Sequence, residues 1–216
     1  MSATDSEARA ADDARARGTP PAWRPLPPRS RARWRRLDGR GGERSSIERV
    51  RDGWRCAGVV EVDDGSRPYR LRYLVECDAA WRTAACAVDG RVGRTSFRAT
   101  FDADRRGGWR IDGAAAPELA GAFDVDLGFT PSTNLLPLRR LDLAVGASAS
   151  VASAWLRFPE LRIERLEQTY RRVADSIVRY RALVDGETFE ARLDVDAYGR
   201  VVRYEGLWER VAASPE

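Results

Sequence analysis

Segments in which apolar and polar residues alternate recur along the chain, and no helical period is sustained over three turns beyond the N-terminal tail. In the clearest segment, residues 69–77, Tyr69, Tyr73 and Cys77 share one face while arginine and glutamate occupy most positions between. Successive strand residues point to opposite sides of a sheet, so this alternation predicts a strand with one buried face. Its recurrence predicts a mainly β fold.

Short turn-forming sequences separate these segments, as in β-hairpins. Asp185-Gly186-Glu187 lies between alternating runs at 176–184 and 188–195, and an Asp-Gly pair is a strong hairpin signal. We therefore expect a single antiparallel meander of about ten strands, with at most one or two short helices, at 114–120 or 159–166. Such a sheet must close or curl to protect its edges, and a curled sheet has a concave apolar face that needs a guest or a covering helix.

The N-terminal residues differ from the rest in composition. Residues 1–30 are rich in proline and arginine, which predicts a disordered tail followed by one β domain at 31–216. Residues 1–36 contain nine arginines and four acids, a net charge of +5, whereas the whole chain carries +4. The domain itself is therefore close to neutral, and we expect no specific nucleic-acid partner; a binding role for the basic tail is the less favoured alternative.

The chain contains neither histidine nor lysine. This excludes Ser-His-Asp and Cys-His catalysis, Schiff-base chemistry, histidine metal sites and the lysine of a phosphate-binding loop. We therefore expect no metal, no cofactor and no catalytic activity.

Three features bear on location. The three cysteines form no Cys-x-x-Cys pair, and their odd number is typical of free thiols in a reducing compartment. The first residues are acidic and lack the apolar core of a secretory signal, and no run is apolar enough to span a bilayer. We expect a cytoplasmic protein without a transmembrane segment; its oligomeric state is open.

The most informative stretch is residues 123–143. It begins with an alternating segment in which Asp124 and Asp126 lie opposite phenylalanine, valine and leucine. A polar turn is predicted at 130–134 and a return strand at 138–143.

The predicted return strand contains two adjacent arginines, Arg139 and Arg140. Whichever face of the strand is buried, one guanidinium must point into it, and a buried arginine is costly unless it meets an acid or a ligand. An ion pair with Asp124, Asp126 or Asp142 is favoured over a contact with the phosphate, carboxylate or sugar hydroxyls of a ligand. Which arginine points inward is left open.

Asn134 and Gln168 are the only carboxamides of the chain. We expect Asn134 chiefly to cap the turn after Pro131, with a ligand contact as the alternative.

Two Asp-x-Asp pairs, Asp124 with Asp126 and Asp194 with Asp196, raise the possibility of a sugar hydrolase. Residues two apart on a strand are separated by about 6.6 Å, within the carboxyl spacing of inverting glycosidases. An acid and a base, however, need opposed positions and different pKa values, so an ordinary solvated strand face is favoured.

Several short sequence motifs stand out along the chain, including parts of the stretch 123–143. They are Tyr73, Asp78, Trp81 and Thr83; Gly107-Gly108-Trp109; Asp124-Val125-Asp126-Leu127; Thr130-Pro131-Ser132-Thr133-Asn134-Leu135-Leu136-Pro137-Leu138-Arg139-Arg140-Leu141; Ala154-Trp155-Leu156; Phe158-Pro159-Glu160-Leu161; Gln168-Thr169-Tyr170; and Tyr204-Glu205-Gly206-Leu207-Trp208. With them, the chain resembles a family of small bacterial proteins called "putative glycolipid-binding", over residues 34 to 212.

The resemblance implies a curved antiparallel sheet around an apolar cavity, similar to the periplasmic lipoprotein carriers. It also implies a glycolipid or another amphiphile as partner, with Arg139 or Arg140 near its head and Trp81 and Trp155, which match family motifs, near its tail. Asn134, Asp124 and Asp126 complete the candidate ligand-binding residues. A sugar hydrolase acting through paired aspartates and a protein-interaction module remain the alternatives.

Overall fold

In a computed structural model, which describes residues 22–63, 67–104 and 106–211, the chain forms one large curved sheet with only short helices, which confirms the predicted fold class. The strands are β1 (Arg29–Arg36), β2 (Arg40–Val50), β3 (Gly53–Asp63), β4 (Tyr69–Asp78), β5 (Thr83–Val92), β6 (Thr95–Ala103), β7 (Trp109–Ile111), β8 (Ala114–Ala115), β9 (Asp124–Leu127), β10 (Ser148–Arg157), β11 (Arg162–Ala174), β12 (Ile177–Val184), β13 (Glu187–Val195), β14 (Val201–Tyr204) and β15 (Trp208–Val211). The helical elements are η1 (Pro117–Leu119), η2 (Ser132–Asn134) and α2 (Leu135–Leu141).

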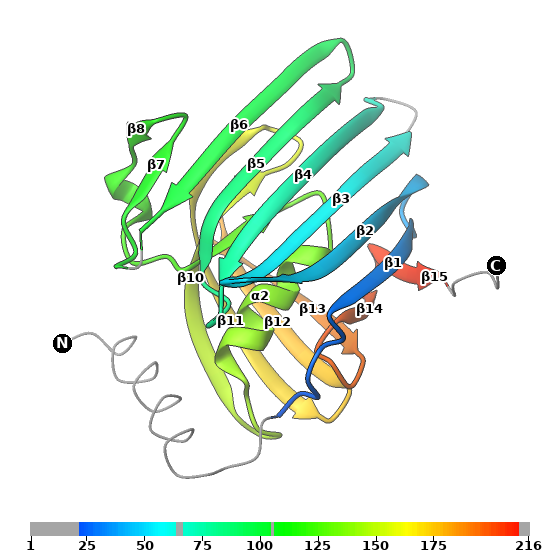
Figure 1. Ribbon diagram of the computed structural model, residues 1–216. Coiled ribbons are helices and arrows are strands. Elements are labelled where there is room, and N and C mark those ends of the chain that lie inside the picture. The colour runs from blue at the N-terminus through cyan, green and yellow to red at the C-terminus, as the bar shows by residue number, and fades with distance from the viewer. Residues whose placement is uncertain (1–21, 64–66, 105, 212–216) are drawn as a thin grey trace.

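The two ends of the described chain meet in the middle of the sheet. Its spatial order runs from β8 down to β1, then from β15 down to β9, so the first and last strands are neighbours (Figure 1). β1 and β15 pair antiparallel, with Arg33 opposite Val211 and Arg36 opposite Trp208. This seam joins an N-terminal half, β1–β8, to a C-terminal half, β9–β15.

Local sequence explains the regular strands and hairpins. β4 alternates between buried and exposed residues along most of its length, as predicted for 69–77. The hairpin predicted at Asp185-Gly186 is confirmed: Val184 pairs with Glu187, and both turn residues have positive φ, at 51° and 82°. Two consecutive residues of positive φ match the twist of the flanking strands.

The central stretch differs from the prediction. Residues 138–143 do not form a return strand; α2 occupies Leu135–Leu141, and β9 instead pairs parallel to β10. Pro137 lies in the first turn of the helix, where a missing N–H costs no hydrogen bond. The apolar residues of this stretch fit a strand period of two, but Leu135, Leu138 and Leu141 also have helical spacing.

This parallel pair determines where the helix lies. Parallel neighbours need a crossover between them, and here η2 and α2 provide it. The crossover places α2 on the concave side of the sheet, between its two halves (Figure 1). Of the two alternative ranges predicted for a short helix, 114–120 contains the short η1, whereas 159–166 is a turn that leads into β11.

The two faces of the sheet have different chemistry. The convex face carries cross-strand ion pairs, such as Arg72 with Asp89 at 2.5 Å and Arg181 with Glu190 at 2.5 Å. The concave face carries the apolar core, on which the leucines of α2 are buried. The covering helix expected for a curled sheet is therefore present.

The expected tail divides into two parts. Residues 1–21 lie outside the described residues. Within 22–30, Trp23 is buried, its indole N–H donates to the Leu138 carbonyl at 2.9 Å, and the Arg172 guanidinium lies 3.9 Å above its ring. The packed unit therefore begins before residue 31. Along the described ranges, no helix is long and apolar enough to cross a membrane.

Candidate functional site

A cavity of about 490 Å³ lies on the concave side of the C-terminal half. Its apolar wall is formed by inward side chains of this half, among them Trp155, Leu166, Tyr180, Val184, Phe189 and Trp208. The segment after β9 bounds it with Thr130 and Asn134, and β9 itself contributes Asp126. The volume lies within the range of about 300–1,000 Å³ that is typical of small-molecule sites.

A small side chain helps to keep this space open. Ala182 of β12 lies between Gln168 of β11 and Phe189 of β13 in the strand register. The Phe189 ring faces the cavity and contacts Tyr180 with a centroid distance of 6.1 Å, yet Phe189 is 40% exposed. An inward aromatic residue that remains exposed offers apolar surface to a ligand.

Asp126 supplies a carboxyl group to the polar end of the cavity. Gln168 Nε2 donates to its Oδ2 at 2.5 Å, and the Thr133 hydroxyl is a second hydrogen-bond partner. Burial raises the pKa of Asp126 to about 6, because the carboxylate loses the hydration that stabilises its charge in water. The predicted solvated face of β9 is therefore wrong for Asp126 and also for Asp124, which is 1% exposed.

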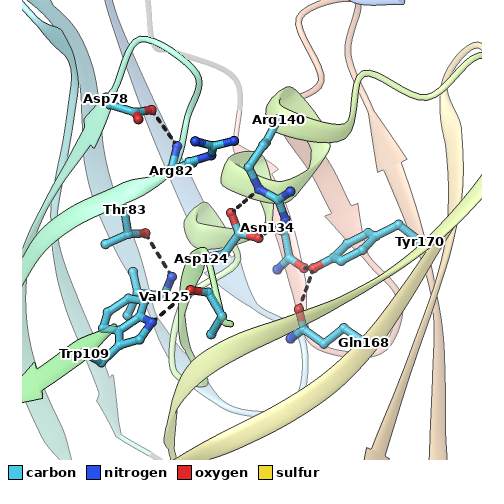
Figure 2. A network of polar contacts seen from close by, with 11 residues as sticks. Asp78, Arg82, Thr83, Trp109, Asp124, Val125, Asn134, Arg140, Gln168 and Tyr170 are labelled. Atoms are coloured by element: carbon cyan, nitrogen blue, oxygen red, sulfur yellow. Dashed lines mark hydrogen bonds and ion pairs between the residues drawn. The ribbon is translucent and has the colours of Figure 1, made fainter. Parts of the chain in front are cut away.

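A network of neutral polar side chains surrounds this carboxyl. The Tyr170 hydroxyl donates to Asn134 Oδ1 at 3.1 Å and to Gln168 Oε1 at 3.4 Å. Figure 2 shows these three side chains pointing toward one another. Gln168 Nε2 also donates to the Tyr180 hydroxyl at 3.0 Å. Asn134 donates weakly to the Pro131 carbonyl at 3.5 Å, so it combines the expected turn contact with a place in the cavity wall.

Arg157 also lines the cavity, and it lies among acids. Its Nη1 and Nη2 bond the two carboxylate oxygens of Asp185 at 2.9 and 2.6 Å. Glu160 and Glu164 each lie 3.4 Å from the same guanidinium. These contacts raise the pKa of Arg157 above its ordinary value, the Asp185 bond being the largest cause.

Arg140 forms the ion pair that was the favoured interpretation. It binds Asp124 through two bonds, at 3.1 Å from Nε and 2.5 Å from Nη2 (Figure 2). Both side chains are largely buried, and the ring of Phe123 packs 5.7 Å from the guanidinium. This pair joins α2 to β9, and neither residue lines the cavity.

Arg139 and Trp81 lie together away from the cavity lining. Arg139 Nη1 donates to the carbonyls of Arg24 and Tyr198 at 3.0 and 3.4 Å, and its guanidinium lies 5.5 Å from the Trp81 ring. Trp81 is buried and stacks on Trp54 at 4.9 Å. Of the predicted ligand-binding residues, the structure thus brings Asn134, Trp155 and Asp126 together at the cavity, but not Arg139, Arg140, Trp81 or Asp124.

The aspartate pairs do not form opposed carboxyls. Asp124 is held by Arg140, so only Asp126 of that pair faces the cavity. Asp194 pairs with Arg192 at 2.7 Å, and Asp196 pairs with Arg200 and Arg210, both at 2.8 Å. The pKa of Asp196 is lowered despite the opposing effect of its burial, because these arginines stabilise the charged form.

Glu43 is a polar site that sequence reasoning missed. Its buried carboxylate accepts hydrogen bonds from the Tyr73, Thr130 and Ser132 hydroxyls at 2.5, 2.6 and 2.6 Å. It therefore ties β2 to the segment that bounds the cavity, and burial raises its pKa to about 7. No local signal could have identified it, since β2 shows no clear alternation and two of its partners lie more than 80 residues away in sequence.

Comparisons with known proteins agree with this architecture. The model of the family described as "putative glycolipid-binding" matches residues 31–210. The chain is similar to a crystal structure of a DUF1089 family protein from Pseudomonas aeruginosa, with 30% identity and a TM-score of 0.68, over 88% of this chain and 95% of that one. Among curated proteins, none matches. The protein thus belongs to the family described as "putative glycolipid-binding", as its motifs predicted.

Proposed function

We propose that the protein binds one amphiphile, a glycolipid or a similar lipid-like molecule, in the cavity of its C-terminal half. The observation that carries this proposal is the exposed Phe189 ring on the wall of a 490 Å³ cavity that none of the described side chains fills. Burial of apolar surface there would stabilise the bound hydrocarbon chain of an amphiphile by about 25 cal/mol for each Å² removed from water. The family description supports the same class of ligand.

The proposed role is binding without catalysis. Glycoside hydrolysis needs an acid and a second carboxyl placed on either side of the scissile bond. Asp126 faces the cavity, but its neighbour Asp124 is engaged by Arg140, and the pair Asp194–Asp196 is engaged by other arginines. This arrangement favours a carrier or sensor over a hydrolase that acts through paired aspartates.

We also propose a cytoplasmic location. Cys56, Cys77 and Cys86 are free thiols on neighbouring strands and are buried. Burial raises their pKa values above the ordinary value, which makes them poor nucleophiles. Thiols without a disulfide are typical of a reducing compartment. Fractionation of the native host, with the protein detected by antibody, tests this location.

The binding test uses the purified full chain. Native mass spectrometry, followed by organic extraction and lipid analysis, should detect one bound amphiphile per protein. In parallel, titration with an alkyl glucoside below its micelle concentration should change the fluorescence of Trp155 and Trp208, both in the cavity wall.

A matched pair of variants makes this test specific to the cavity. Ala182→Phe should fill the cavity and weaken binding by about tenfold or more, whereas Leu183→Phe, on the exposed opposite face of β12, should not. A protein that carries no amphiphile and binds none of a glycolipid panel would contradict the proposed function.

A further inference from the structure

The charged side chains of the cavity are mostly acidic. Within the described residues, its lining contains the acids Asp126, Glu160, Asp185 and Glu187 and a single base, Arg157. Clefts lined by one sign of charge repel ligands of the same sign. The cavity is therefore unfavourable for a negatively charged head group.

The one arginine does not offset this effect, because acids already occupy it. Two of its nitrogens bond Asp185, and Glu160 and Glu164 lie within 3.4 Å. A phosphate or carboxylate head would have to displace Asp185 and approach two further carboxylates. Arg157 is thus not an available anion-binding group.

The carboxyl of Asp126, in contrast, is bound only by neutral groups. Its hydrogen-bond partners are Gln168 and Thr133, and along the described chain no arginine forms an ion pair with it. A carboxylate has about four acceptor positions, so Asp126 has capacity to accept further hydrogen bonds from a ligand. The raised pKa of Asp126 is consistent with this lack of a cationic partner.

The groups around Asp126 match a polyol. Tyr180 and Asn134 line the same cavity, and their hydroxyl and amide can both donate and accept hydrogen bonds. The aromatic ring of Trp155 lines the cavity as well, with the Arg157 guanidinium 5.5 Å from the centre of the ring. A sugar presents hydroxyls that donate and accept in turn, whereas a quaternary ammonium group has no N–H or O–H to give to Asp126.

We propose that the cavity selects its amphiphile by head-group charge: it binds an uncharged, hydroxyl-bearing head with one hydroxyl donating to Asp126, and it rejects phosphate and carboxylate heads. This inference rests on the proposed function, since it specifies the ligand of the same cavity. In this arrangement Asp126, and not Arg139 or Arg140, meets the head group.

The test compares single-chain amphiphiles that share a dodecyl tail. Dodecyl glucoside, dodecyl phosphate and dodecyltrimethylammonium are titrated below their micelle concentrations, with tryptophan fluorescence and native mass spectrometry as readouts. The glucoside should bind about tenfold or more tightly than the phosphate, and also more tightly than the ammonium compound.

Asp126→Asn provides the residue-level test, because asparagine keeps the size of the side chain but removes its charge. We expect the glucoside to bind about tenfold less tightly and the preference over the phosphate to shrink. Asp194→Asn is the matched control: Asp194 belongs to the other aspartate pair and contacts Arg192 rather than the cavity. Thermal unfolding of both variants checks that the fold is retained.

The outcomes separate the two proposals. If the three amphiphiles bind equally, or if the phosphate or ammonium compound binds most tightly, head-group selection is wrong while binding itself stands. If Asp126→Asn leaves the preference unchanged, Asp126 is not the selecting residue and the inference fails. If no amphiphile binds, the proposed function and this inference both fail.

Discussion

The two halves of the sheet are built from the same kind of strand but differ in what covers their concave faces. Over the N-terminal half, Phe129 of the crossover packs against Tyr73 of β4 at 6.2 Å, and it also contacts Phe158, which follows β10, at 5.9 Å; Phe129 is fully buried. In the C-terminal half, Phe189 has the same side chain but lines an open cavity. The contrast teaches that one crossover segment, residues 127–141, can fill one part of a curved sheet and leave the other part free.

The sharpest test of this contrast is to remove the phenylalanine ring that lies over each half. Phe129→Ala should lower the free energy of unfolding by about 3–5 kcal/mol, because it leaves a cavity in a packed core. Phe189→Ala should cost about 1 kcal/mol or less, since the ring is already partly exposed. Urea unfolding measures both, and equal costs would show that the halves are packed alike.

The second comparison concerns ion pairs. Arg140→Ala should destabilise the protein by about 3–5 kcal/mol, because it leaves the buried Asp124 carboxylate without its partner. Arg157→Ala removes contacts to exposed acids at the cavity and should destabilise the protein much less than Arg140→Ala, because solvent screens such pairs. A double variant, Asp124→Asn with Arg140→Gln, should recover part of the larger loss; no recovery would argue against the pair as the cause.

The third prediction concerns pH, through the carboxyl that ties the packed half to the crossover. Glu43 has a folded-state pKa of about 7, above its ordinary value of 4.5, so the folded state retains a proton that the unfolded state loses. Stability should therefore fall as pH rises from about 5.5 to 8, by about 2 kcal/mol.

Variants assign this pH dependence. Glu43→Gln should remove most of the slope, whereas Glu61→Gln, on the convex face where Glu61 pairs with Arg70, should leave it. Asp126, whose pKa is raised to about 6, contributes with the same sign in the lower part of this range. Urea unfolding at several pH values provides the measurement, and an unchanged slope in Glu43→Gln would exclude Glu43 as its source.

The smallest effect is expected where a side chain is added to open space. Ala182 and Ala99 are equally buried, but only Ala182 lines the cavity. Ala99→Phe should cost about 1–3 kcal/mol through overpacking, whereas Ala182→Phe should change stability by less than about 1 kcal/mol. Thermal unfolding of the two variants compares them directly, and a large cost for Ala182→Phe would mean that the cavity is not free.

The strands were predictable where the sequence repeats locally. The alternation of residues 69–77 and the Asp185-Gly186 turn gave a correct strand and a correct hairpin, because period-two burial and turn chemistry act over a few residues. The helix α2 was not predicted, since its apolar residues fit a strand period over so short a range and only the parallel pairing of β9 with β10 requires a crossover.

The candidate site was predictable only in part. Two adjacent arginines pointed to a buried charge, and Arg140 indeed pairs with Asp124. The position of Asp126 on the cavity wall depends on which strands lie across from β9. The burial of Glu43 depends on a strand register that places it opposite Val60, and on the hydrogen bond that it accepts from Thr130. Such relations arise from tertiary structure and leave no local pattern.

The seam between β1 and β15 also has a consequence for how the polypeptide could be threaded. If the end of β15 were joined to the start of β1, and the chain were opened between η1 and β9, the strands would follow one another in the order in which they lie in the sheet. In such a circular permutant, β1 and β15, which are the paired strands farthest apart in the natural sequence, would become consecutive strands. In the natural order, by contrast, synthesis must reach Trp208–Val211 before the edge of β1 can be covered.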